Sequence, residues 1–560
     1  MRLTRFRIQS FRGIRHLEVE LDPLTVFIGE NNTGKTSVFD ALALCLGRPG
    51  GAFATHFRKA DFHRPARGGS PQPIELSLTF SAPEDGASVP DALRPALTTD
   101  QDQVRRLHVQ FRGRPGNGRI EPRFTDEQGR PLEAGSSNSA LDELRRLHPV
   151  LLLRFAQGAV FESPAVGASA PPERGERRRR QQLEVEVARA YHELSSIRGP
   201  VPLAHLRRGL DAATELYESM RPERLPDLTP LRGMIDTLVR PPDEEDAASG
   251  EIRELEQAGS GSHTLALLLV LGALLDGPGH ALFPGTADPV ITIEEPEAHL
   301  HPILLASIWD VIESLGAQTL VTTNSGELLS SVPMRTLRRL SRKDGRVHVH
   351  RLHAGRLSDT ELRRVGYHIR ATRGGALFSR CWLLVEGESE FWLMRQLAHV
   401  LGHDLDAEGV RCVEFAQCGV VPLVKVAADL GIEWHLLTDG DGSGATYAAE
   451  AERYLNGKRR ALRISRLRRR DIERCFWYHG YQHVYRKAAG LPEDGGGRRS
   501  HGRPGQVIAR AVRARSKPYL ALTVAEAAAA RGPEGVPPVL RHVIETSVTL
   551  AREAVRDLPT

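Results

Sequence analysis

The sequence predicts an α/β protein made of two successive parts, the first of which is interrupted by a helical segment. Three observations predict this fold class. Apolar runs of strand length recur near the start of the chain, again shortly before residue 330, and again after residue 381. Residues 181–238 are instead polar, with apolar side chains at helical spacing and no strand pattern. The 560 residues are enough for roughly three to four domains.

The expected elements follow in order along the chain. The pattern predicts strands at residues 3–9, 17–21, 24–28, 74–80 and 150–155, with loops rich in Gly, Pro and Asp up to about residue 140. It further predicts helices at 37–46 and 265–275 and strands at 290–293, 319–322, 382–385 and 434–438. The changes of sequence pattern along the chain divide it into four segments. They are the N-terminal half of a first domain (1–168), a helical insertion (169–250), the C-terminal half of the first domain (251–370) and a second α/β domain (371–560).

Composition excludes several protein classes. The chain is 40% hydrophobic and 26% charged, which is ordinary for a folded protein. The longest apolar run, residues 265–275, is shorter than a membrane span, and the N-terminus has no apolar segment typical of a signal peptide. Five cysteines without a CxxC pair argue against a disulfide framework or a zinc ribbon. We therefore expect a soluble, cytoplasmic protein with no membrane partner.

Positive charge is concentrated near the C-terminus. Of the 75 basic residues only seven are lysines, a bias that a GC-rich coding genome explains. Residues 456–517 hold 18 Lys and Arg against four Asp and Glu, although the net charge of the whole chain is only +5. Such a segment indicates either a surface for a polyanion or a solvated, arginine-rich face.

Residues 29–36 read GENNTGKT and fit the P-loop pattern GxxxxGK[ST] completely. They follow a predicted strand and precede a predicted helix, which is the context that the motif requires. Glycines let backbone N–H groups face phosphate oxygens, Lys35 reaches the β- and γ-phosphates, and the Thr36 hydroxyl binds Mg²⁺. The motif predicts an ATP site with Mg²⁺ at Gly29, Asn31, Asn32, Gly34, Lys35, Thr36 and Ser37.

The acidic partner of this P-loop is expected on a neighbouring strand. Residues 290–296 read VITIEEP, a buried strand that ends in two carboxylates. Glu294 is expected to hold the Mg²⁺, and Glu295 to orient or deprotonate the attacking water. The long separation from the P-loop fits a domain that is interrupted by an insertion.

Residues 8–14, IQSFRGI, together with the P-loop resemble the ABC-type ATPase heads of the SMC, RecF and OLD (overcoming lysogenization defect) group. Residues 294–302, EEPEAHLHP, resemble the Walker B motif and D-loop of OLD ATPases. The resemblance implies that Ser260 and Gly261, in GSGS, form the ABC signature that caps ATP bound to a second subunit. It therefore implies an ATP-dependent homodimer, with the helical insertion serving dimerisation. The alternative for GSGS is a flexible turn.

The resemblance also implies a switch strand at residues 321–328, VTTNSGEL, where Asn324 stands at a position usually held by histidine. Asparagine donates a hydrogen bond to a γ-phosphate but carries no proton, so we expect slow ATP turnover or use of ATP as a clamp. The alternative is that Asn324 is a simple turn residue with no role at the nucleotide. For the Q-loop residue, Asp61 and Gln157 both remain candidates.

A second group of carboxylates follows two predicted strands of the C-terminal domain. Glu386 and Glu390 come after the strand at 382–385, and Asp439 and Asp441 after the strand at 434–438. The carboxyl ends of parallel strands meet at one edge of a sheet, so these side chains are expected to converge. Oxygen ligands without histidine or cysteine favour Mg²⁺ or Mn²⁺. The sequence therefore predicts a metal site at this edge.

A glutamate followed by DxD resembles the Toprim pattern of topoisomerases, primases and OLD nucleases. After an OLD-like ATPase, it implies an OLD-type nuclease. By the same resemblance, Glu473 is an additional metal ligand and Lys517 stabilises charge on the scissile phosphate. The alternatives are a surface ion pair for Glu473 and a solvated cation for Lys517.

The leading hypothesis is an ATP-binding and ATP-hydrolysing, Mg²⁺- or Mn²⁺-dependent endonuclease that acts on double-stranded DNA, in DNA repair or phage defence. In this hypothesis Asp439 bridges two metal ions and the basic residues of 458–470 grip the DNA backbone. The aromatic residues of 476–485 either stack on unpaired bases or, as we favour, pack in the core. The alternative function is a RecF-like DNA clamp that does not cut, and a primase- or topoisomerase-like enzyme ranks lowest.

Overall fold

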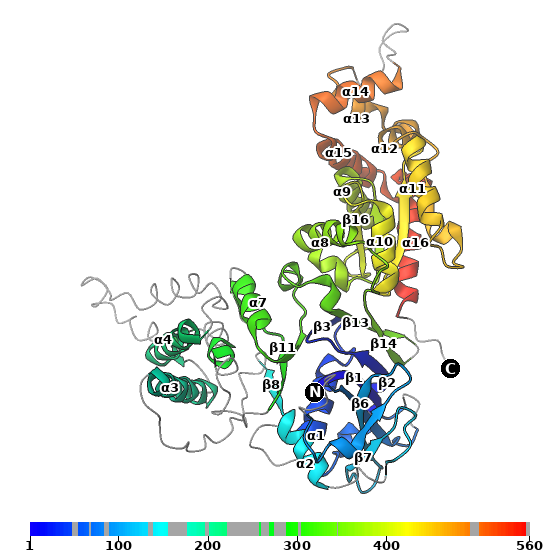
Figure 1. The fold of residues 1–560 in the computed structure, drawn as a ribbon. Helices are drawn as coiled ribbons and strands as arrows, with labels where there is room; N and C mark the ends of the chain where they lie inside the picture. Colours follow the sequence, from blue (N-terminus) through cyan, green and yellow to red (C-terminus); the bar gives the residue numbers. More distant parts are fainter. Residues whose placement is uncertain are drawn as a thin grey trace, which may run out of the picture. The chain divides into compact units, whose positions relative to one another are not determined.

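The protein is described by a computed structural model. It covers residues 1–47, 54–65, 69–82, 89–132, 138–154, 176–196, 201–220, 257–258, 268–273, 287–298, 300, 304–343, 345–492 and 503–555. The chain forms two compact units, Met1–Val349 (unit 1) and His350–Thr560 (unit 2). In Figure 1 unit 1 runs from blue to green and unit 2 from green to red.

An antiparallel sheet opens unit 1. Its strand order is β2-β1-β4-β6-β5, with β7 also paired to β6. The strands are β1 (Arg2–Phe11), β2 (Ile14–Glu20), β4 (Ile74–Ser81), β5 (Leu97–Thr99), β6 (Arg105–Gly113) and β7 (Glu121–Thr125). The predicted strands near residues 3–9, 17–21 and 74–80 are confirmed. The prediction of loops up to about residue 140 was wrong, because β6 alternates buried apolar residues with polar ones and pairs along its whole length with β4.

The second sheet of unit 1 has the order β14-β13-β3-β12-β11-β8. Its strands are β3 (Leu24–Gly29), β8 (Val150–Arg154), β11 (Val290–Glu294), β12 (Gln318–Thr322), β13 (Leu337–Lys343) and β14 (Arg346–His350). The strands from β13 to β8 are parallel. This explains the continuous apolar runs that predicted β3, β8, β11 and β12, since parallel strands are covered on both faces.

The order of this sheet corrects one expectation. The strand that carries Glu294 is not next to the P-loop strand, because β12 lies between β3 and β11. All three strands are parallel, so their carboxyl ends still lie at the same edge of the sheet. The P-loop, the residues after β12 and the two glutamates at the end of β11 are therefore arranged side by side in that order.

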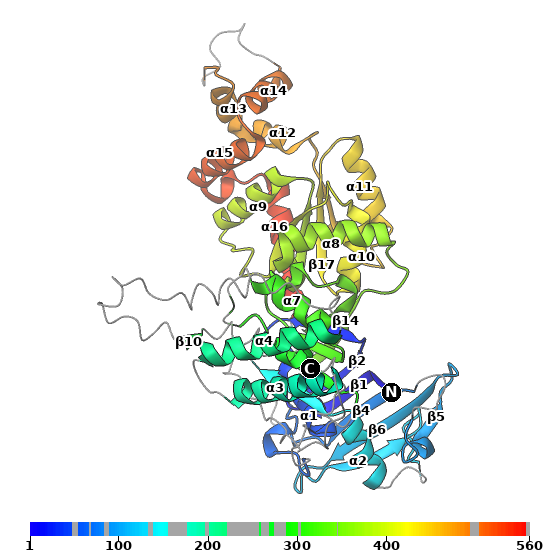
Figure 2. The same ribbon diagram turned by 60° about the vertical axis from the view of Figure 1, so that its left-hand side comes forward.

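The helices of unit 1 include α1 (Lys35–Leu46), α2 (Asn138–Leu147) and α7 (Leu304–Ser314). Within the expected helical insertion, α3 (Glu176–Ser196) and α4 (Leu203–Met220) lie side by side (Figure 2). The two-residue strands β9 (Val201–Pro202) and β10 (Gln257–Ala258) pair here, so the expectation of a strand-free segment was wrong in this detail. Residues 268–273 are helical. The rest of the helix expected at 265–275 and the linkers expected at 164–172 and 241–250 lie outside the described residues.

Unit 2 is built on a parallel four-stranded sheet with the order β16-β15-β17-β18. The strands are β15 (Cys381–Val385), β16 (Val410–Glu414), β17 (Glu433–Thr438) and β18 (Ile464–Arg466). The predicted strands at 382–385 and 434–438 are confirmed. The helices are α8 (Asp359–Arg373), α9 (Glu388–Val400), α10 (Val420–Asp429), α11 (Gly442–Glu452), α12 (Ile472–Phe476), α13 (Gln482–Ala488), α14 (Pro504–Ala514), α15 (Lys517–Ala530) and α16 (Pro538–Glu553). Its core joins β15 and α9 to α15 and α16.

Two further observations concern the whole chain. Among the residues with described coordinates, no helix has both the length and the apolar character needed to cross a bilayer. All five cysteines are free thiols: Cys45, Cys381, Cys412 and Cys418 are buried, and Cys475 is half-buried.

Candidate nucleotide site and carboxylate centre

The P-loop has the backbone that its glycines were expected to provide. Gly34 caps α1 with φ 98°, and Asn32 is also left-handed, with φ 69°. A Cβ on Gly29 would lie 2.4 Å from the Leu340 carbonyl oxygen, so no larger residue fits there. Lys35 is buried and donates to the Gly29 carbonyl oxygen at 2.6 Å. Burial lowers the pKa of Lys35, although nearby carboxylates oppose this. Asn31, Asn32 and Thr36 are exposed, and Ser37 is half-buried.

Glu294 lies directly beside the P-loop helix. The Thr36 hydroxyl donates to its Oε1 atom, which brings together the two residues expected to bind Mg²⁺. The Glu294 Oε2 atom accepts from Arg154 Nε at 2.8 Å. Arg154 ends β8 and stands opposite Glu294 in the parallel register of β8 and β11. Sequence reasoning did not identify Arg154, because nothing in its own strand indicates that register.

Arg154 belongs to a longer chain of ion pairs. It also binds Asp40, which lies one helical turn after Thr36 on α1. Asp40 is bound in turn by Arg12, and Arg12 Nε donates to Asp61 Oδ1 at 2.9 Å. The spacing of four between Thr36 and Asp40 places both on one face of the helix, a signal that the sequence did carry. The result is a continuous series of alternating charges from Asp61 to Glu294, here called the arginine relay.

Glu295 and Asn324 contact each other at the same sheet edge. Glu295 is left-handed, with φ 51°, and its Oε1 atom accepts from Asn324 Nδ2 at 2.5 Å. Glu297, which was not predicted, accepts from the Thr323 hydroxyl and the Asn324 backbone N–H, both at 2.8 Å. Burial raises the pKa of Glu297. The Walker B segment therefore holds the switch segment through two carboxylates.

Four other predicted residues need separate mention. Ser260 and Gly261, the expected signature, lie outside the described residues, as does Gln157, one candidate for the Q-loop. The other candidate, Asp61, is buried in the arginine relay, where it also accepts from the Arg58 backbone N–H at 2.9 Å.

In unit 2 the carboxylate centre begins at the ends of two paired strands. Glu386 follows β15 and Asp439 follows β17, which are parallel neighbours. The loop after Asp439 is tightly packed, since a Cβ on Gly440 would lie 2.1 Å from the Arg469 carbonyl oxygen. A Cβ on Gly444 would lie 2.0 Å from the carbonyl oxygen of Asp439 itself. Glycine at both positions lets the loop close over the sheet edge.

The carboxylates act on one another. Burial, followed by the negative charges of Glu390, Glu386 and other acids, raises the pKa of Asp439 to about 8. Burial and the charge of Glu473 raise the pKa of Glu390 to about 7. Burial and the charge of Asp441 raise the pKa of Glu386. The five predicted carboxylates therefore interact within one centre, as the sequence indicated.

Two members of this centre have additional contacts. Lys517 Nζ lies 3.7 Å from Glu473 Oε1, so the two residues implied by the family resemblance do meet. Asp441 caps α11 by accepting from the Gly444 N–H at 2.8 Å. Capping uses one carboxylate oxygen and leaves the second for another partner.

The donor set of the carboxylate centre suits a hard cation. All five predicted ligands offer carboxylate oxygens, and the buried Glu386 Oε2 atom has no hydrogen-bond partner. Closely spaced buried carboxylates are favourable when a cation neutralises them. As placed, however, no three His, Cys, Asp or Glu side chains in the described part of the chain are arranged to hold a metal ion. The residues fit the expected metals in chemistry, but they are not a preformed cage.

Some basic and aromatic residues around the centre contact neighbouring protein groups or pack in the core, and others are exposed. Lys458 binds Glu433 at 2.8 Å, and Arg466 donates to the Asp441 carbonyl oxygen at 2.7 Å, whereas residues 468–470 are exposed arginines. Four of the aromatic residues pack in the core, which confirms the favoured interpretation for Phe476, Trp477, Tyr481 and Tyr485. Tyr478 is exposed.

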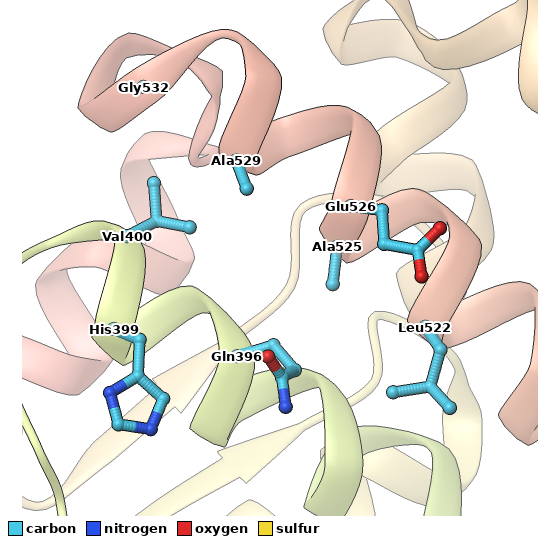
Figure 3. A pocket seen from close by; sticks show the side chains of 8 residues that line it. All are labelled: Gln396, His399, Val400, Leu522, Ala525, Glu526, Ala529 and Gly532. Carbon is cyan, nitrogen blue, oxygen red and sulfur yellow. The ribbon is translucent and has the colours of Figure 1, made fainter.

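A groove of about 460 Å³ runs between α9 and α15. Figure 3 shows side chains from both helices around it, including the polar groups of Gln396, His399 and Glu526. The N-terminal turns of the same two helices carry Glu390 and Lys517. Contact between α9 and α15 therefore helps to set the distance between the carboxylates and the lysine.

Comparison with known proteins gives a consistent result. Residues 1–376 match the family model described as "Protein of unknown function (DUF2813)", and residues 377–441 match "Overcoming lysogenization defect protein-like, TOPRIM domain". The chain is 35% identical to the "Uncharacterized protein YbjD" of Escherichia coli over 99% of both chains. It is 23% identical to the "OLD nuclease" of Thermus scotoductus over 78% of this chain and 82% of that protein.

Among solved structures, an Smc head bound to the C-winged helix domain of ScpA aligns with a TM-score of 0.35 and 15% identity, covering 63% of this chain and 98% of that one. The predicted resemblance to OLD proteins is confirmed by the Toprim family model and the Thermus relative. With a P-loop sheet in unit 1 and a Toprim match in unit 2, the chain belongs to the DUF2813 family and joins an ATPase-type domain to an OLD-like Toprim domain.

Proposed function

We propose that this chain is an ATP-binding and ATP-hydrolysing, divalent-metal-dependent DNA endonuclease that nicks or cleaves duplex DNA. The observation that carries the proposal is the carboxylate centre. Acidic side chains from three segments raise one another's pKa at the edge of a parallel sheet, and Lys517 stands beside them. The OLD-like Toprim match and the OLD nuclease of Thermus scotoductus support the same chemistry.

The nucleotide site would act through the residues at the edge of the P-loop sheet. Lys35 and the P-loop N–H groups would bind the phosphates, and Thr36 with Glu294 would hold Mg²⁺. Glu295 would orient the attacking water. Its contact with Asn324, which cannot carry a proton, supports slow turnover of ATP.

In the carboxylate centre, five side chains would hold Mg²⁺ or Mn²⁺: Glu386, Glu390, Asp439, Asp441 and Glu473. Divalent ions bound there supply a nucleophilic hydroxide and stabilise the leaving 3′-oxygen. Lys517 would place its positive charge beside the scissile phosphate, and Glu473 would orient that lysine. The exposed arginines at 468–470 would bind the DNA backbone without reading its sequence.

The proposal extends to assembly and biological role. The resemblance of Ser260 and Gly261 to an ABC signature supports a homodimer in which these residues of one subunit cap the ATP of the other. Measuring the mass of the protein in solution with and without ATP tests this dimer, and a monomer in both states contradicts it. DNA repair and phage defence both fit this chemistry.

The decisive experiment is a plasmid cleavage assay. Purified protein is incubated with supercoiled plasmid and Mg²⁺ or Mn²⁺, in parallel with ATP, with ADP and without nucleotide. Nicked or linear product that disappears in Asp439→Ala supports the nuclease. Lys35→Ala should abolish ATP hydrolysis, and its effect on cleavage shows whether ATP licenses cutting. Intact plasmid under every condition contradicts the proposal.

A second candidate is a RecF-like, ATP-driven DNA clamp that binds DNA without cutting it. The observation that favours it is that the described residues contain no preformed arrangement of three metal ligands. Under this hypothesis the plasmid stays intact while the protein binds it tightly, and Asp439→Ala leaves binding unchanged.

A further inference from the structure

Two tyrosines are half-exposed on unit 2. Tyr478 is 53% exposed and Tyr519 is 50% exposed, whereas the nearby Tyr481 and Tyr485 are buried. Single exposed aromatic rings are common and need no explanation by themselves. These two differ from an ordinary surface tyrosine in their partners and in the elements that carry them.

Each ring is paired with an arginine. The guanidinium carbon of Arg469 lies 4.0 Å from the centre of the Tyr478 ring, and that of Arg515 lies 5.4 Å from the centre of the Tyr519 ring. An arginine over a ring holds it in place by cation–π attraction and adds positive charge. Each pair therefore presents a fixed aromatic surface next to a cation, the combination on which unpaired bases stack.

Both pairs are attached to the carboxylate centre. Tyr478 follows α12, which carries Glu473, and the backbone of its partner Arg469 packs against Gly440 in the loop between Asp439 and Asp441. Tyr519 lies in the first turn of α15, two residues after Lys517. In Figures 1 and 2, α12 and α15 lie in the same part of unit 2. Tyr519 thus lies on the same helix as Lys517, and Tyr478 lies directly after the helix that carries Glu473.

We propose that Tyr478 and Tyr519, each with its arginine, stack on unpaired bases next to the scissile phosphate. The preferred substrate is then duplex DNA that contains unpaired nucleotides, such as a bubble, fork or flap. This inference rests on the proposed function and names its substrate. Stacking is tolerant of sequence, because every base offers a flat face.

The test measures DNA binding by the full chain in EDTA, so that cleavage plays no part. Fluorescence anisotropy compares a duplex with a bubble of the same sequence and length. Tyr478→Ala and Tyr519→Ala should each weaken binding to the bubble by about 5- to 50-fold and change duplex binding by less than about twofold. Tyr478→Phe and Tyr519→Phe retain the ring and should bind the bubble as the wild type does.

Tyr367 offers a matched control, since it is 71% exposed but lies on α8. Tyr367→Ala should leave both affinities unchanged. An equal loss on bubble and duplex, no loss on either, or a loss in Tyr367→Ala as large as in the other variants overturns the inference. The plasmid assay tests the proposed nuclease separately from this binding experiment. A bubble preference that depends on the two tyrosines supports this inference even if the plasmid stays uncut, and the uncut plasmid then contradicts the nuclease alone.

Discussion

Asp439 and Glu390 are held where their charged forms are unfavourable. Burial is the largest cause for both, and neighbouring carboxylates add to it, so their pKa values are about 8 and about 7. An acid whose pKa rises on folding stabilises the folded state only while it is protonated. This stabilisation is complete below the pKa of the unfolded chain, about 4, and is lost as the pH rises through about 7 and then about 8.

The unfolding temperature of unit 2 in EDTA should therefore fall as the pH is raised from about 6 to about 9. Asp439→Asn removes one of the titrating acids and should flatten this fall by a few degrees, which circular dichroism measures. Added Mn²⁺ should restore stability most at high pH, because it favours the ionised carboxylates. If the unfolding temperature of Asp439→Asn falls with pH as steeply as that of the wild type, Asp439 does not titrate in this range.

Gly440 and Gly442 form a matched pair in the DGDG loop. A Cβ on Gly440 would lie 2.1 Å from one backbone oxygen and 2.5 Å from another, whereas a Cβ on Gly442 would meet nothing within 4 Å. Gly440→Ala should destabilise unit 2 by about 1–3 kcal/mol and reduce plasmid cleavage at least tenfold. Gly442→Ala should be neutral in both thermal melts and cleavage. Similar behaviour of the two variants would mean that the loop relaxes around the added methyl group.

The arginine relay connects Arg12, in the turn after β1, to α1, β8 and β11 and ends at Glu294. Removing a group that orients a metal-binding carboxylate commonly costs 10- to 100-fold in activity. Arg154→Ala should accordingly lower kcat for ATP hydrolysis by roughly tenfold or more, with KM changed less than about threefold. Arg154→Lys should recover part of the loss.

Arg130 provides the control for this experiment, because it forms an exposed ion pair with Asp126 at 2.7 Å. Arg130→Ala should leave ATP hydrolysis unchanged, since exposed ion pairs contribute little. If Arg154→Ala hydrolyses ATP at the wild-type rate, the arginine relay has no part in catalysis.

Elements that bury apolar runs were predictable from the sequence. β3, β11, β15 and β17 are continuous apolar segments, and the motifs at their ends gave the P-loop, Glu294 and the carboxylates of unit 2. β6 was missed although its apolar residues Leu107, Val109 and Phe111 alternate with polar ones, because this short pattern lies among segments rich in Gly, Pro and Asp that predict loops. The position of β12 between β3 and β11, and hence the pairing of Arg154 with Glu294, depends on strand order, which no local pattern encodes.

At the scale of the whole molecule, the described residues include two large and separate hydrophobic clusters, one in each unit. One is built from the sheets of unit 1, with members from Leu3 to Val347, and the other from β15 and the C-terminal helices, with members from Cys381 to Ala551. In the proposed function, each unit has its own ligand site. Ligands that bind only the folded state stabilise the part that they bind.

Calorimetry should therefore show two unfolding transitions. A non-hydrolysable ATP analogue with Mg²⁺ should raise only the transition of unit 1, and Lys35→Ala should abolish this shift. Mn²⁺ alone should raise the transition temperature of unit 2, and Asp439→Ala should abolish this increase. At about a hundredfold excess of ligand over Kd, each shift corresponds to roughly 2.7 kcal/mol. A single transition that responds to both ligands would indicate one cooperative unit.

The five cysteines have a practical consequence. Burial raises the pKa of the thiols of Cys45, Cys381, Cys418 and Cys475, to about 11 for the last two, and Cys412 is buried as well. Thiolates, not thiols, react with maleimides, so the native side chains should label slowly. A single cysteine introduced at an exposed position such as Tyr367 would then carry a spin label or fluorophore almost alone. Distances between two labelled copies could be followed while ATP is added, without first removing any natural cysteine.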